Sequence, residues 1–108
     1  MKIGPANMKE MLKQAQKMKE ELEHLQNEAG EKTVEASSGG GMVTVVAKAK
    51  GEIVSVKIDP SIIEEGDIEM VQDLVVAAVN EALNRGRELL QQEIGKVAAS
   101  LGLPPGLL

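Results

Sequence analysis

The chain has 108 residues, a net charge of −5, no cysteine, and no Phe, Tyr or Trp. This length suits one small domain, and the missing cysteines exclude disulfides, thiolate nucleophiles and thiolate metal ligands. A core without aromatic side chains is assembled from Val, Ile, Leu, Met and Ala, which bury less area per residue. Such a thin core favours association with another chain.

Positive and negative charge occupy separate parts of the chain. Five lysines against one glutamate give residues 1–19 a net charge of +4, whereas residues 20–35 carry −5 and residues 58–81 carry −7. A negative total disfavours nucleic acid as a partner. Because the charges are separated along the chain, residues 1–19 nevertheless form a basic segment.

Apolar residues between positions 8 and 29 recur at alternating spacings of three and four, the heptad pattern of a helix with a narrow apolar seam. We expect a helix over residues 7–29, with Asn7 as its cap, Glu10 in the capping-box position and Gly30 at its end. A seam this narrow suits a helix that projects and pairs with another helix; the alternative is that it packs on the domain's own sheet. The seam consists of Met8, Met11, Ala15, Met18, Leu22, Leu25 and Ala29.

Lys9, Lys13 and Lys17 are four residues apart and therefore form one ridge on this helix. Such a lysine ridge is suited to tracking a phosphate backbone, with each lysine acting as a point charge. The alternative is an ordinary solvated face, on which lysines pair with the glutamates of residues 20–23.

Residues 33–59 alternate between apolar and polar positions and are interrupted by glycines at 39–41 and at 51. This pattern predicts a three-stranded antiparallel meander with one apolar face. A phosphate-binding loop needs a helix directly after its glycines, and here a strand follows. We therefore interpret the triple glycine as a turn.

Two-residue loops at Gly39-Gly40 and Gly51-Glu52 would fix the registers of both strand pairs. Both registers place apolar residues on one face, and a slip by one residue would mix the faces. The expected pairs are Ala36 with Val43 and Val34 with Val45, then Val45 with Ile58, Ala47 with Val56 and Ala49 with Val54, and on the other face Lys50 with Ile53, Lys48 with Ser55 and Val46 with Lys57.

Residues 67–100 are predicted to form a long helix after a cap at Asp67. Two apolar stripes make its middle apolar nearly all round, so it needs more than one packing partner. Gly86 lowers helix propensity by about 1 kcal/mol relative to Ala, which leaves a kink or break there as an alternative. The stripes are Val71, Leu74, Val75, Ala78 and Ala82, and Val76, Val79, Leu83, Leu90, Ile94 and Val97.

A homodimer through this helix and the sheet is the economical way to cover the second stripe. We place the dimer interface at Val76, Val79, Leu83 and Leu90.

Residues 101–108 form an apolar tail in which Pro104 prevents continuation of the helix, and we expect a strap or a contact for another chain. The longest apolar run, residues 74–79, is too short to span a bilayer, and no signal peptide is recognised at the N-terminus. We expect a cytoplasmic protein without a membrane partner.

The sequence offers no catalytic constellation. His24 is the only histidine, and with Glu20 and Glu23 it makes at most a weak metal signal. Glu64 and Glu65 are expected in a loop without apolar surroundings to raise a pKa, and neither phosphate-binding glycine motif occurs. We expect no enzyme activity, no cofactor and no metal site.

Several segments, in one order and spacing, carry a resemblance to a known family. They are residues 11–18 (MLKQAQKM), 38–43 (SGGGMV), 51–60 (GEIVSVKIDP), 73–82 (DLVVAAVNEA), Gly95-Lys96 and 101–104 (LGLP). From about residue 8 to 106, the chain resembles the YbaB/EbfC family of nucleoid-associated proteins. The resemblance implies one α+β domain over residues 1–108 that forms a tweezer-like homodimer, with a β-rich centre and helical arms.

The resemblance also implies that the chain binds double-stranded DNA, mostly without sequence specificity, and contributes to nucleoid organisation and to gene regulation. The alternative function is a dimeric protein-interaction scaffold with incidental DNA affinity, which the acidic net charge and the heptad favour. Family members are thought to contact DNA with the first helix and the C-terminal helical segment. The matching basic residues here are Lys9, Lys13, Lys17, Lys19, Arg85, Arg87 and Lys96.

Overall fold

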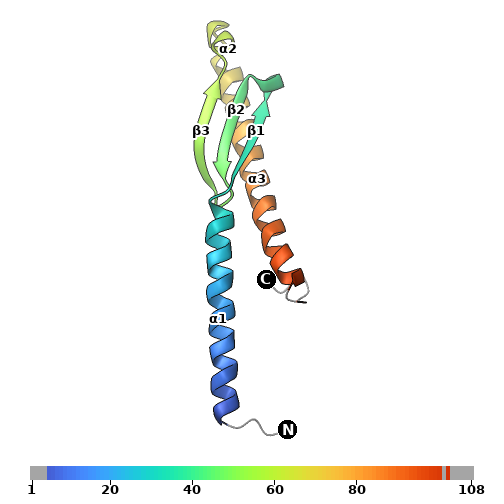
Figure 1. The fold of residues 1–108 in the computed structure, drawn as a ribbon. Coiled ribbons are helices and arrows are strands. Elements are labelled where there is room, and N and C mark those ends of the chain that lie inside the picture. The colour runs from blue at the N-terminus through green and yellow to red at the C-terminus, as the bar shows by residue number, and fades with distance from the viewer. Residues whose placement is uncertain (1–4, 101, 103–108) are drawn as a thin grey trace.

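The computed structural model describes residues 5–100 and residue 102. Figure 1 shows a three-stranded sheet with the long C-terminal helix packed across it and the long N-terminal helix projecting from one end. The predicted tail at 101–108 lies outside the described residues apart from Gly102. In chain order the elements are α1 (Pro5–Gly30), β1 (Thr33–Ser38), the 3₁₀ turn η1 (Gly39–Gly41), β2 (Val43–Lys48), β3 (Glu52–Ile58), α2 (Pro60–Glu64) and α3 (Ile68–Ser100).

The molecule is elongated, with extents of 75 × 20 × 18 Å. The sheet is antiparallel with the order β1-β2-β3, and α3 packs mainly across β1 and β2. Figure 1 shows α1 and the C-terminal half of α3 leaving the same end of the sheet as two diverging rods, with α1 reaching further. The α+β class and the expected order of helices and strands are confirmed.

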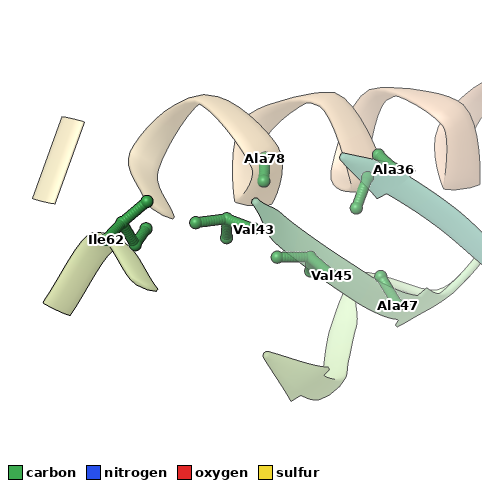
Figure 2. Close-up of a cluster of buried hydrophobic side chains, with 7 residues drawn as sticks. Ala36, Val43, Val45, Ala47, Ile62 and Ala78 are labelled. Carbon is green, nitrogen blue, oxygen red and sulfur yellow. The ribbon is translucent and has the colours of Figure 1, made fainter. Parts of the chain in front are cut away.

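The core lies between the apolar face of the sheet and α3. Val43, Val45 and Ala47 on β2 are fully buried, and Ala78 and Ala82 of α3 pack against them. Figure 2 shows Val43 directed between α2 and α3. The small side chains allow the helix to lie close to the sheet, and the predicted apolar face of β1 and β2 is confirmed.

The predicted register of the first strand pair is wrong by two residues. Ala36 pairs with Val45 and Val34 with Ala47, because the connection runs from Gly39 to Met42 and is not a two-residue loop. All three glycines of η1 have positive φ, from 61° to 95°, a conformation that costs glycine little. A shift of two residues keeps each side chain on its predicted face.

The second register is also wrong. Val45 pairs with Val56, and the connecting loop spans three residues, 49–51. A bulge between Val46 and Ala47 then pairs Ala47 with Ile53, so Ile53 joins the apolar face and Val54 is the extra residue of β3. The prediction had these two residues on the opposite faces.

The start of α1 and the presence of α2 depart from expectation. The helix α1 begins at Pro5, a residue suited to a first helical turn, so Asn7 lies inside the helix and is not its cap. The short helix α2 was not predicted, although the Asp59 side chain accepts a hydrogen bond from the Ser61 backbone N–H at 2.9 Å. Glu64 is therefore the last residue of a helix and not part of a loop.

The helix α3 continues without a break through Gly86. Gly86 is buried, and a Cβ atom there would lie 3.1 Å from the Ala49 Cα and 3.3 Å from the Lys48 carbonyl oxygen. Glycine therefore permits α3 to cross the end of the β2–β3 hairpin at close range. The predicted cap at Asp67 is confirmed, since its side chain accepts a hydrogen bond from the Met70 N–H at 3.0 Å.

Candidate nucleic-acid interface

The basic side chains of α1 are exposed along a helix that projects from the sheet. Lys9, Lys13, Lys17 and Lys19 are all exposed, and among the described residues none of these four forms an ion pair. The expected alternative, pairing with residues 20–23, is therefore not seen. At 100° per residue, the lysine ridge lies on the side of α1 opposite the Met11 and Ala15 positions of the seam.

The C-terminal half of α1 is acidic. It carries Glu20, Glu21, Glu23 and Glu28, and His24 pairs with Glu28 at 3.0 Å on the helix surface. Within the described residues no three His, Cys, Asp or Glu side chains are grouped to hold a metal. This acidic half repels phosphate, so the basic surface of α1 is confined to its free end.

The root of α1 is fixed to the sheet by an ion-pair cluster. Glu31 contacts Lys50 at 2.7 Å and Lys48 at 2.8 Å. Hydrogen bonds from Lys48 and Lys50 lower the pKa of Glu31 from 4.5 to about 2, and the pKa of Lys50 is raised by the Glu31 carboxylate. These lysines are partnered, which sets them apart from the lysines of α1.

A second ion pair joins this root to α3. Lys32 contacts Glu93 at 2.9 Å, and its hydrogen bond and charge, with a smaller effect of Lys96, lower the pKa of Glu93. Both contacts lie where the arm leaves the sheet, beside backbone hydrogen bonds from the Ala49 N–H to the Lys32 carbonyl oxygen and from the Lys50 N–H to the Gly30 carbonyl oxygen.

The basic residues of α3 differ in their surroundings. Arg85 donates to the Glu81 carboxylate at 3.1 Å and to the Glu35 carbonyl oxygen of β1 at 2.7 Å, so it braces the outer edge of the sheet. Arg87 hydrogen-bonds to Asn84, and Lys96 is exposed. The seven predicted basic residues thus fall into an α1 group and an α3 group, and no sequence pattern indicated the bracing contact of Arg85.

An apolar surface runs along β3, the edge strand that α3 covers least. Ile53, Val56 and Ile58 are 37–42% exposed, although each pairs with a fully buried residue of β2. On α3, Val76 is 59% exposed, while the other predicted interface residues, Val79, Leu83 and Leu90, are half-buried. By helical periodicity Val79 and Leu83 lie on the flank away from Arg85, which is the β3 side.

One shallow apolar pocket of about 110 Å³ lies between α2 and the start of α3. It is lined by Ile62, Ile63, Gly66, Asp67, Ile68, Val71 and Gln72. It lacks convergent polar groups of the kind that orient a substrate. No helix in the described part of the chain is long and apolar enough to cross a membrane.

These features define a small α+β protein with a basic helical arm, and comparison with known proteins places it among DNA-binding proteins and not among enzymes. The chain belongs to the YbaB/EbfC DNA-binding family, which it matches over residues 4–101.

Relatives extend over nearly the whole chain. A nucleoid-associated protein of Acetivibrio thermocellus is 50% identical over 101 residues, which cover 94% of this chain and 89% of the relative. Another, from Thermodesulfovibrio yellowstonii, is 55% identical over 95 residues, 88% of this chain and 83% of the relative. The crystal structure of an uncharacterized protein from Helicobacter pylori shares the fold, with a TM-score of 0.63, 29% identity, and coverage of 81% of this chain and 88% of that one.

Proposed function

We propose that this protein binds double-stranded DNA through the lysine ridge of α1, largely without regard to sequence, and so helps to organise the nucleoid and influences gene expression. The observation that carries the proposal is the set of exposed lysines on the free end of the arm, which form no ion pair with any other described residue. The names of the relatives support a location at the nucleoid.

The chemistry of the ridge favours phosphate over bases. Lysine is a flexible point charge that neutralises phosphates, and phosphate contacts position a protein on DNA without reading its sequence. Arg87 and Lys96 are further exposed basic side chains on α3, separate from the lysine ridge. Arg85 is a weaker candidate, because its guanidinium is already engaged by Glu81 and by β1.

The proposed functional unit is a homodimer joined along β3 and the adjoining flank of α3. Ile53, Val56 and Ile58 form an apolar strip that α3 leaves partly uncovered, and Val76 lies on the same side of the molecule. A surface of this kind on a soluble chain marks an interaction site. Arg85 obstructs β1, so β3 is the edge that remains for a second copy.

Salt-dependent titration of a short labelled duplex of mixed sequence tests the DNA-binding proposal. The logarithm of affinity is expected to fall linearly with the logarithm of salt, by about 0.9 per phosphate contact. Replacing Lys9, Lys13 and Lys17 together by Gln is expected to flatten this slope. Absence of binding by the wild type even at low salt would contradict the proposal and favour the protein-interaction scaffold.

A control with the same change in net charge separates the ridge from overall charge. Ser37→Asp, Gln72→Glu and Asn80→Asp together also remove three positive units from the net charge, at exposed positions away from α1. This control is expected to keep the wild-type salt slope. Equal losses in both triple variants would contradict a role for the ridge.

Sedimentation equilibrium tests the dimer independently of DNA. Val76→Glu alters a side chain that is 59% exposed in the single chain, so the fold tolerates it while the proposed interface does not. We expect monomers with an unchanged helical circular dichroism spectrum. Ala77→Glu, on the opposite flank and also exposed, is expected to stay dimeric, and a dimeric Val76→Glu variant would refute this interface.

A further inference from the structure

The free end of α1 carries an apolar seam that nothing in the described chain covers. Met8, Met11 and Leu12 are 56–69% exposed, and Met18 is 42% exposed. Further along the same seam, Leu22 and Leu25 are half-buried and Ala29 is buried, where α1 runs beside α3. Figure 1 shows the rest of α1 extending past the end of α3.

We propose that the exposed seam of α1 pairs in antiparallel orientation with the same seam of a second copy, and thereby links one dimer to another. This inference rests on the dimer and DNA-binding roles proposed above. The heptad spacing permits a two-fold symmetric arrangement with four apolar layers. Met8 then lies opposite Met18 of the second copy, and Met11 opposite its Ala15.

The antiparallel register accounts for Leu12, which is 69% exposed and lies outside the strict seam. In the heptad of this seam it occupies the flanking position after Met11, and the two-fold axis brings it beside Leu12 of the second copy. A parallel pair would instead place Leu12 beside Asn7 of the other helix. Only the antiparallel arrangement gives this side chain an apolar neighbour.

The charges along the seam are compatible with the same arrangement. Gln14 meets its own copy, and Glu21 lies near Asn7 of the second copy, so the flanks bring no like charges together. Parallel and antiparallel pairing both place the basic segment of one helix beside that of the other, so the charges do not distinguish the two arrangements. The choice of the antiparallel pair rests on the position of Leu12.

The lysine ridges stay free in this arrangement. Because Lys9, Lys13 and Lys17 lie opposite the seam, pairing turns the two ridges outward, in opposite directions. The linked arms therefore present basic surfaces to two separate DNA segments. The structure thus suits the bridging of duplexes by pairs of dimers.

Association through the seam is expected to be weak in free solution. A helix of about 17 residues is only about 25 Å long, and one narrow stripe on it buries much less than the roughly 1,600 Å² of a standard interface. When several dimers bind to one DNA molecule, their effective concentration rises. This favours pairing of their seams, although the contact itself is unchanged. We therefore expect pairing to increase when duplex DNA is added.

The absence of native cysteine permits a direct test by site-specific crosslinking. The full chain is prepared as Leu12→Cys and, as a matched control at an exposed neutral position away from the seam, as Gln16→Cys. A short bismaleimide crosslinker is added with and without duplex. We expect Leu12→Cys to crosslink roughly tenfold faster than Gln16→Cys, because pairing holds its thiols at a high effective concentration. Equal rates under both conditions would overturn the proposal, whether or not the protein binds DNA.

A DNA-bridging assay tests separately whether seam pairing links two duplexes. Bead-bound duplex, protein and a second labelled duplex are mixed, and the captured label is measured. Met11→Gln with Met18→Gln is expected to lose most of the capture while keeping the wild-type salt slope for binding to a single duplex. Full capture by this variant would show that the seam is not the link, whereas loss of single-duplex binding would point to a fault in the DNA-binding proposal.

Discussion

Gly86 and Gly95 provide a matched test of how closely α3 approaches the sheet. Both lie in α3, where replacing Gly by Ala favours the helix by about 1 kcal/mol. At Gly95 an added Cβ meets nothing within 4 Å, whereas at Gly86 it lies 3.1 Å from the Ala49 Cα and 3.3 Å from the Lys48 carbonyl oxygen. The two substitutions are therefore expected to change stability in opposite directions.

The size of each stability change follows from a helix-propensity term and an overpacking term. Gly95→Ala gains the helix term of about 1 kcal/mol. Gly86→Ala gains the same term and loses about 1–3 kcal/mol through overpacking against backbone atoms that must shift, for a net loss of about 1 kcal/mol. At about 4 °C per kcal/mol for a domain of this size, the two variants differ by about 8 °C in Tm.

Thermal unfolding followed by circular dichroism at 222 nm is the appropriate assay, because the chain lacks the Trp and Tyr used for fluorescence. All variants are compared at one protein concentration, since self-association alters the apparent Tm. If Gly86→Ala raises Tm as much as Gly95→Ala, a Cβ at position 86 does not overpack against the sheet, and the explanation given for this glycine is wrong.

Two further predictions concern the root of the arm and the start of α3. The pKa of Glu31 is depressed to about 2 by Lys48 and Lys50, so its stabilising contribution is present above its ordinary pKa of 4.5 and is lost as pH falls toward 2. Urea midpoints of the wild type and Glu31→Gln should therefore differ at neutral pH and converge between pH 4.5 and 2; a constant difference would exclude this ion-pair origin. Asp67→Ala removes the cap that accepts the Met70 N–H and is expected to cost about 1 kcal/mol, measured by urea denaturation at pH 7, with Asp67→Asn retaining most of the stability.

The sequence was sufficient to identify the two long helices, the three strands and the buried face of β1 and β2, because heptad spacing and strand alternation are local patterns. It was not sufficient for the registers. Hydrophobic alternation is unchanged by a shift of two residues, so pairing Ala36 with Val43 or with Val45 satisfies the same pattern. The length of the glycine turn decides between them. The bulge that exchanges Ile53 and Val54 is likewise invisible to alternation.

Sequence reasoning likewise predicted one part of the candidate site and missed another. The exposure of Lys9, Lys13 and Lys17 follows from their helical spacing, and the structure adds that they lack partners among the described residues. The role of Arg85 depends on the Glu35 carbonyl oxygen, 50 residues away in sequence, which composition does not reveal. The short helix α2 had a local signal in Asp59, Pro60 and Ser61, since an acidic cap followed by proline is typical of a helix start.

The contact between Arg85 and Glu35 has a consequence for the size of the assembly. An open sheet edge is a template for pairing with a strand of another chain, and a sheet with two unprotected edges can extend into a fibre. The guanidinium of Arg85 occupies a backbone carbonyl of β1, which leaves β3 as the open edge. If two copies pair along β3, as proposed above, neither open edge remains, and any larger assembly would have to grow through helix contacts.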